Sequence, residues 1–310
     1  MRKYAIGFVV GAILAGATAV YADNAINAVL FPAKYEVNGE AKQLPDGYST
    51  INVDGHAYVP IRFIAESLGA VVAYDHDSTT IQVDNNFHVT NMNSGIRAGH
   101  LQVTKTAEGS AVEGKLFVGQ DHWEAMANSR KSGIAPGSDV TVTGDLLFYD
   151  DQGKYIGKVP IQAAFVAKGD QIRDFKATAD RDVTGYAFAS LANVGPVPMG
   201  LPVPPTVDVY DSSNRLGVGD FRMAAQDGFT KIRGWVSLKQ TGNYRYDATL
   251  NFYDAAGKAL GTAELKQTGS GSAESFTATT FETAGKGDFT GYKSVSVTVN
   301  TFEPTSDPSK

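Results

Sequence analysis

Residues 51–83, INVDGHAYVPIRFIAESLGAVVAYDHDSTTIQV, predict a complete small α+β unit. Pro60 suits the first turn of a helix, because that position needs no N–H donor. Apolar residues then recur at the spacing of one helix face: Ile61, Ile64, Ala65 and Leu68. Gly69 follows them and tolerates the left-handed conformation in which many helices end. The stretch therefore contains one short helix, with β-branched runs before and after it.

Strand and turn signals surround this helix on both sides. Residues 70–74 and 79–83 are β-branched runs separated by the turn Asp75-His76-Asp77-Ser78. Upstream, Tyr35-Glu36-Val37 runs into Asn38-Gly39, a pair that tolerates the positive φ of a hairpin turn. We predict a domain over residues 23–84 in which the helix packs on a curled sheet.

A family resemblance rests on the same residues. The letters YVPIRFIAESLGAVVAYD (58–75) and TTIQV (79–83) resemble the stalk-type N-terminal domain named after copper amine oxidases. In the oxidases this domain is a peripheral stalk, and it also occurs in secreted Gram-positive proteins that are not oxidases. The resemblance therefore implies a surface module and implies no chemistry.

Residues 1–22 are a predicted signal peptide. Arg2 and Lys3 form a positive start, an apolar run follows, and Val20-Tyr21-Ala22 has the residue sizes that a signal peptidase reads. A retained membrane anchor is the alternative, because residues 5–22 are nearly long enough to cross a bilayer. The chain has no Cys and a formal net charge of −6, so nucleic acid and anionic lipid are not expected partners. We expect a secreted, extracellular protein associated with the cell wall.

The rest of the chain contains an internal repeat at a fixed offset of 104 residues. The matching segments are Phe148-Tyr149-Asp150, Gly153-Lys154 and Gly157 in the first copy, and Phe252-Tyr253-Asp254, Gly257-Lys258 and Gly261 in the second. Six identities at one offset indicate a duplication. In each copy we expect a strand, a turn and a second strand. In that turn, Asp accepts backbone N–H bonds and Gly supplies a positive φ.

Alternating apolar and polar runs around these hairpins predict two β-sandwiches, residues 98–194 and 207–303. Both are similar to the FxLYD-type sandwich domains of secreted bacterial proteins, although the first copy carries an extra polar segment, Gln120 to Asp139. A Pro-rich linker over residues 195–206 is expected to separate the sandwiches, with packing of this segment on a sandwich edge as the alternative. Residues 304–310 are predicted to be a polar tail. The predicted fold class is mostly β, with a small α+β domain at the N-terminus.

The sequence predicts no catalytic, cofactor-binding or metal-binding residue. Its five histidines lack the H-x-H or H-E-x-x-H spacing that aims two imidazoles at one metal. Asn243-Tyr244 is followed by Arg245, whereas the quinone motif of the copper amine oxidases has an acid there. Asp75 and Asp150 suit local turns better than a Ca²⁺ site or an acid–base pair. We expect that the acids and imidazoles do not converge in one pocket.

Aromatic side chains are the remaining candidates for a binding site. Trp123 lies in the polar segment His122-Trp123-Glu124, and a ring in such a segment could face solvent. Tyr244 and Tyr246 alternate along the chain and share one face of a strand. An aromatic face is apolar with weakly polar edges, so these rings could stack on the sugars of a cell-wall glycan. Packing in a sandwich core or on its edge is the alternative for all three residues.

We therefore expect a non-enzymatic secreted or surface-associated protein, a structural or adhesive module at the envelope of a Gram-positive-type bacterium. Its partner would be a cell-wall glycan or an envelope protein. A membrane would be a partner only if the segment 1–22 is retained. Two alternatives remain open: a glycan-binding protein that uses Trp123 or the Tyr244 and Tyr246 face, and an unrecognised hydrolase.

Overall fold

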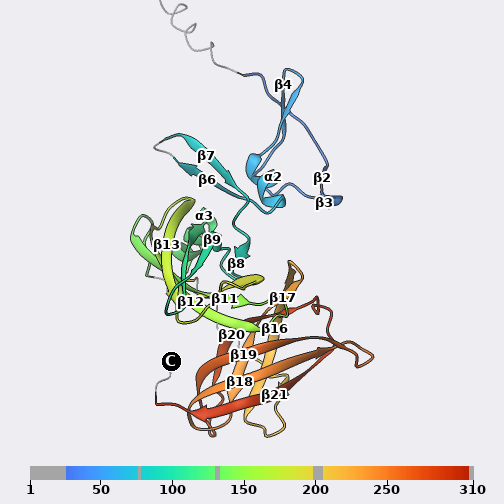
Figure 1. Ribbon diagram of the computed structural model, residues 1–310. Helices are drawn as coiled ribbons and strands as arrows, with labels where there is room; N and C mark the ends of the chain where they lie inside the picture. Colours follow the sequence, from blue (N-terminus) through green and yellow to red (C-terminus); the bar gives the residue numbers. More distant parts are fainter. Residues whose placement is uncertain (1–25, 76–77, 130–132, 198–204, 307–310) are drawn as a thin grey trace, which may run out of the picture. The chain divides into compact units, whose positions relative to one another are not determined.

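A computed structural model describes residues 26–75, 78–129, 133–197 and 205–306 of the chain (Figure 1). The fold is mostly β, with a small α+β part at the N-terminus, as the sequence predicts. By its contacts the chain divides into one unit that ends at Gly69 and a second that begins at Ala70.

Several sequence-based predictions fall outside the described residues. The predicted signal peptide lies there, as do the turn residues His76 and Asp77, the centre of the Pro-rich linker and the last residues of the predicted tail. Among the described residues, no helix is both long enough and apolar enough to cross a membrane.

The first unit combines short strands with one helix. Its elements are β1 (Val29–Leu30), β2 (Tyr35–Val37), β3 (Glu40–Lys42), β4 (Ile51–Val53), β5 (His56–Tyr58) and α2 (Ile61–Ser67). Strands β1, β4 and β5 form one antiparallel sheet in that order, and β2 pairs with β3.

The turn and helix signals of this unit are confirmed. The predicted turn at Asn38–Gly39 adopts positive φ of 54° and 81°, and the turn at Asp54–Gly55 between β4 and β5 has the same character, with 50° and 86°. Helix α2 begins directly after Pro60. Gly69 follows the helix with φ of 85°, a conformation that glycine adopts without steric cost.

The predicted apolar face of α2 is partly wrong. Phe63 and Ala65 are buried, whereas Ile61 and Leu68 are 49% and 57% exposed. The Phe63 ring packs edge-on against Tyr35 at a centroid distance of 4.9 Å, so the face that carries Phe63 is turned inward. A helix of seven residues makes only two turns, so residues seven apart at its two ends need not both reach the core.

The second unit contains a hairpin and two β-sandwiches. The hairpin is β6 (Val71–Asp75) and β7 (Thr80–Asp84). The first sandwich comprises β8 (Val89–Thr90), β9 (Arg97–Lys105), β10 (Ser110–Val118), α3 (Gln120–Asn128), β11 (Asp139–Tyr149), β12 (Tyr155–Val166), β13 (Gln171–Ala179) and β14 (Phe188–Gly195). The second comprises β15 (Val209–Tyr210), β16 (Leu216–Gln226), β17 (Phe229–Leu238), β18 (Gly242–Tyr253), β19 (Ala259–Gly271), β20 (Ala278–Lys286) and β21 (Ser294–Pro304).

The two sandwiches have the same strand order, which supports the predicted duplication. The first pairs a sheet β8-β9-β10-β13 with a sheet β12-β11-β14, and the second pairs β15-β16-β17-β20 with β19-β18-β21. The difference is the segment between the third and fourth strands of each copy. Residues 119–138 contain α3 in the first sandwich, whereas residues 239–241 suffice in the second.

The repeated turn has the same hydrogen bonds in both copies. Asp150 Oδ1 accepts the backbone N–H groups of Gln152 and Lys154 at 3.0 and 2.8 Å. Asp254 Oδ1 accepts those of Ala256 and Lys258 at 2.8 and 2.9 Å. The predicted role of both acids in the turn is confirmed.

The hairpin β6–β7 packs within the second unit, although its place in the sequence predicts that it belongs to a domain over residues 23–84. Val71 and Ala73 of β6 form a buried cluster with Phe87 and Phe117. The hairpin therefore extends the first sandwich through side-chain contacts.

Candidate functional site

The three aromatic residues proposed from the sequence are buried. Trp123, Tyr244 and Tyr246 expose 4%, 8% and 1% of their surface. Trp123 belongs to α3 and packs against the Phe165 ring at 6.0 Å, and Tyr244 stacks on Phe302 at 4.5 Å. Of the two alternatives weighed for these rings, packing in a sandwich core is the one that the structure shows, because α3 and β18 turn the side chains inward.

A cleft of about 860 Å³ opens beside α3, and Trp123 lines it. Helix α3, the hairpin β6–β7 and the loop from β12 into β13 form its walls. The polar and aromatic side chains that matter here are Tyr74, Gln82, Gln120, Glu124, Asp170 and Arg173. Tyr74 is 39% exposed and so presents part of its ring to solvent.

Hydrogen bonds hold part of this cleft in place. The Gln120 N–H donates to Asp170 Oδ1 at 2.9 Å, and Gln120 Nε2 donates to Glu124 Oε1 at 2.5 Å. Arg173 Nη2 donates to Gln171 Oε1 at 2.7 Å. The Trp123 indole N–H, by contrast, is buried and has no acceptor among the described residues.

The two sandwiches meet in a buried apolar junction. The Phe188 ring of β14 stacks on the Phe229 ring of β17, with centroids 4.6 Å apart and planes 10° from parallel. The junction cluster consists of Leu147, Tyr149, Phe188, Ala192, Phe229 and Ala284. The prediction that a linker holds the sandwiches apart is therefore wrong, since this cluster joins them directly.

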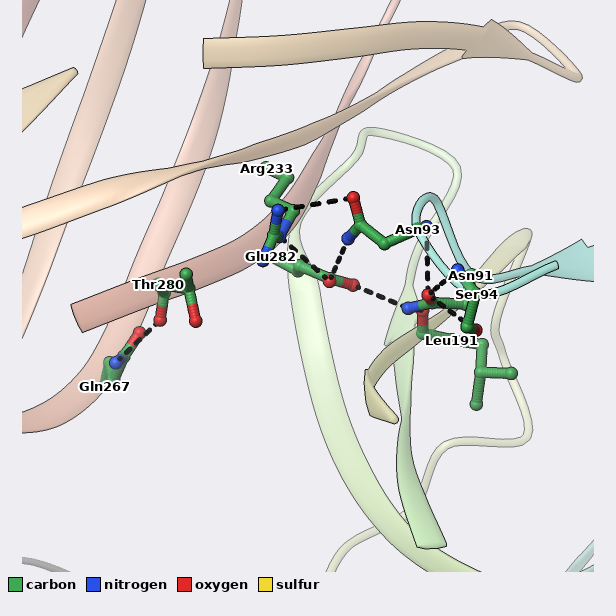
Figure 2. A network of polar contacts seen from close by, with 8 residues as sticks. All are labelled: Asn91, Asn93, Ser94, Leu191, Arg233, Gln267, Thr280 and Glu282. Carbon is green, nitrogen blue, oxygen red and sulfur yellow. Dashed lines mark hydrogen bonds and ion pairs between the residues drawn. The ribbon is translucent and has the colours of Figure 1, made fainter. Parts of the chain in front are cut away.

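A polar network borders this apolar junction (Figure 2). The Glu282 carboxylate lies 3.7 Å from Arg233 Nε and accepts Asn91 Nδ2 and Asn93 Nδ2 at 3.3 and 3.4 Å. Asn91 Nδ2 also donates to the Leu191 carbonyl at 3.0 Å. Figure 2 shows the turn with Asn91 and Asn93 facing the strand that carries Glu282. The turn between β8 and β9 of the first sandwich is thereby bonded to the second sandwich.

Lys231 is the most unusual charge at the junction. The residue is 3% exposed, and its ammonium donates to the carbonyl and hydroxyl oxygens of Thr90, both at 2.6 Å. Burial lowers the pKa of Lys231 to about 8, against the opposing effect of the Glu282 charge. Burial likewise raises the pKa of the Glu282 carboxyl, while Arg233 and Lys231 act in the opposite direction.

A second cleft, of about 710 Å³, lies beside the junction and corrects the expectation that acids do not converge. Its charged lining consists of Asp180, Asp247, Glu264, Glu282, Lys158, Arg181, Arg245 and Lys266. Each carboxylate has a basic partner: Lys266 lies 2.9 Å from Glu264 and 3.4 Å from Asp247. Arg181 lies 3.6 Å from Asp180, and Arg233 reaches Glu282. The acids converge here as ion pairs.

The histidines remain separate among the described residues. His100 Nε2 lies 2.7 Å from Asp84 Oδ2, and burial lowers the pKa of the His122 imidazole. Within the described ranges, no group of three or more His, Asp or Glu side chains is placed to hold a metal ion. Asp75 accepts the Ser78 N–H at 3.4 Å and the Ser78 hydroxyl at 2.6 Å, which confirms its predicted role in a turn.

Comparison with known proteins supports the resemblance seen at the N-terminus. Residues 15–83 match the family model of the copper amine oxidase N-terminal domain. This is a non-catalytic domain, and the match covers less than a quarter of the chain. No curated protein matches the sequence. The likeness of the two sandwiches to FxLYD-type domains stays a prediction.

Proposed function

We propose that this protein is a non-enzymatic, secreted module of a bacterial cell envelope in which the two sandwiches act as one stiff structural element. The observation that carries the proposal is the junction, where the stacked rings of Phe188 and Phe229 are buried. A stiff element transmits force and fixes a distance at a surface, which two sandwiches on a free linker do not.

Two kinds of contact support a fixed orientation of the sandwiches. Apolar packing resists separation, because exposing the junction cluster to water costs free energy in proportion to its area. The bonds of Lys231 to Thr90 and of Asn91 to Glu282 define the angle between the sandwiches, since they are directional. Together they favour one arrangement over a range of arrangements.

Stiffness is tested by measuring a distance across the pair. The chain contains no Cys, so Ala107→Cys and Ala255→Cys, both at exposed turn positions, introduce one spin label in each sandwich. Pulsed electron spin resonance should give a single narrow distance distribution for the full chain. Adding Phe188→Ala should broaden it, whereas adding Phe276→Ala, at a ring that is 56% exposed, should not. A broad distribution without either change would refute the stiff element.

The envelope location has its own test. Fractionation of cells that express the full chain should place it outside the cytoplasm, and N-terminal sequencing should show a chain that begins near Asp23. Recovery from the cytoplasm with Met1 intact would contradict the location and leave the question of stiffness untouched.

Recognition of a cell-wall glycan is the second candidate function. The observation that favours it is the cleft beside α3, which combines the exposed part of Tyr74 with amide and carboxylate side chains. Retention of the protein on purified peptidoglycan is the direct test of this function.

A further inference from the structure

We propose that the cleft beside α3 is a binding site for a neutral, N-acetylated oligosaccharide. This inference rests on the second candidate function, glycan recognition, and is independent of the stiff junction. It assigns the ligand contacts to Tyr74, Gln82, Trp123 and Arg173, which line one cleft although they come from three parts of the second unit.

The size and chemistry of the cleft fit such a ligand. A volume of about 860 Å³ lies in the range of sites that enclose small molecules. Tyr74 supplies an aromatic face of the kind that packs against the apolar face of a sugar ring. Gln82 supplies an amide that both donates and accepts, and Arg173 supplies donors, so ring hydroxyls and acetamido groups find complementary partners.

The indole of Trp123 provides an independent observation. Its N–H is buried and has no acceptor among the described residues, although Trp123 lines the cleft. A buried donor without an acceptor costs free energy, and a ligand oxygen can supply the missing partner. The carbonyl of an acetamido group is an acceptor of the required kind, which is why we infer an N-acetylated sugar.

The charge of the cleft argues for a neutral ligand over an acidic one. Three carboxylates and two basic groups line it: Asp75, Glu124, Asp170, Lys168 and Arg173. The excess of negative charge disfavours uronic acids and other anions.

Binding is tested with the full chain and tri-N-acetylchitotriose, a neutral trisaccharide. Trp235→Phe leaves Trp123 as the fluorescent indole, because the chain contains two Trp residues. Titration should shift the Trp123 emission saturably, and calorimetry on the unmodified chain should give the same affinity. Trigalacturonate, an acidic trisaccharide, should bind at least about tenfold more weakly, because it brings like charge to the cleft.

Matched variants locate the site. Tyr74→Ala and Gln82→Ala should each weaken chitotriose binding about tenfold, and Trp123→Phe should weaken it several-fold by calorimetry. Tyr58→Ala and Gln152→Ala change exposed residues of the same types outside the cleft and should leave the affinity unchanged. Circular dichroism checks that each variant is folded.

The outcomes separate this proposal from glycan recognition in general. The cleft is overturned as the site if chitotriose gives no saturable signal. It is also overturned if the Tyr74→Ala and Gln82→Ala variants bind chitotriose as tightly as the unmodified chain does. If both variants are nevertheless retained on peptidoglycan as the unmodified chain is, the protein recognises the wall elsewhere. If the unmodified chain binds neither chitotriose nor purified peptidoglycan, the second candidate function fails together with its site.

Discussion

The Lys231 ammonium lies 2.6 Å from the carbonyl oxygen of Thr90 and so joins strand β17 of the second sandwich to strand β8 of the first. The lysine is almost fully buried, which is costly for a charged group unless it is well hydrogen-bonded. The carbonyl and hydroxyl oxygens of Thr90 accept hydrogen bonds from this ammonium. The junction therefore contains a buried cation whose protonation should affect stability.

Lys231→Met should change how the free energy of unfolding depends on pH. The pKa of Lys231 is lowered from 10.5 to about 8 by burial, so between these values the unfolded chain binds a proton that the native chain has lost. In that window this group makes stability rise with pH, and below about pH 8 the cost of the buried charge is fully present. Relative to the variant, the unmodified chain should gain about 2–3 kcal/mol from pH 7.5 to 10.5.

Urea unfolding at several pH values measures this difference. Lys258→Met, at an exposed lysine, is the control and should show no such slope relative to the unmodified chain. Parallel curves for Lys231→Met and the unmodified chain over this range would mean that the ammonium is not desolvated in solution.

Phe188→Ala should destabilise the protein by about 3 kcal/mol, because it removes a buried ring and leaves a cavity at the junction. It should also separate the unfolding of the two sandwiches into two transitions, seen by circular dichroism in urea. Phe276→Ala removes an exposed ring and should stay within about 0.5 kcal/mol of the unmodified chain. A single, unshifted transition for Phe188→Ala would contradict the packing described for the junction.

The equivalent glycines of the two repeats offer a matched comparison. Gly153 and Gly257 have φ of 81° and 77°, so alanine is strained at both by about 1 kcal/mol. A Cβ at Gly153 would lie 2.6 Å from the Lys286 backbone N of the second sandwich, whereas a Cβ at Gly257 meets nothing within 4 Å. Gly153→Ala should therefore cost at least about 1 kcal/mol more than Gly257→Ala, since the junction must shift.

Unfolding free energies and the label distance between residues 107 and 255 report this effect. The distance should change in Gly153→Ala and stay the same in Gly257→Ala. If the two variants lose the same unfolding free energy and give the same label distance, the turn that contains Gly153 does not touch the second sandwich.

Asn91→Ala should cost about 2–3 kcal/mol, because the buried Asn91 side chain holds several hydrogen bonds that are lost at once. Asn91 Oδ1 accepts the N–H groups of Asn93 and Ser94, both at 3.0 Å, while its amide nitrogen donates to Leu191. Asn85→Ala, at an exposed position, is the control and should be nearly neutral. The midpoint temperatures of thermal unfolding of the two variants measure this difference. Equal midpoints would contradict a structural role for the Asn91 turn.

The features that sequence reasoning predicted correctly are local ones. The turns at Asp150 and Asp254 follow from the chemistry of Asp and Gly within five residues, and the end of α2 follows from Gly69. The repeat was visible because the identities share one offset. Each of these signals depends on neighbouring residues and can therefore be recognised in the sequence without knowledge of the tertiary fold.

The junction could not be predicted because its residues resemble those of an ordinary half-buried strand. A strand buried on both faces usually appears as a continuous apolar run, and Lys231 and Ser190 interrupt that run in β17 and β14. Lys231 in particular suggests a solvated face. The position of Trp123 stayed open for a similar reason, since its polar neighbours conceal the fact that α3 places the indole in the core.

The closeness of Gly153 to Lys286 has a consequence for how the molecule can be divided. The repeat suggests two fragments of about equal size. Separating them would expose Phe188 on one fragment and Phe229 on the other, and such exposed apolar patches favour aggregation. The repeated unit of the sequence therefore differs in size from the unit that buries all of its apolar surface, because the second includes both copies.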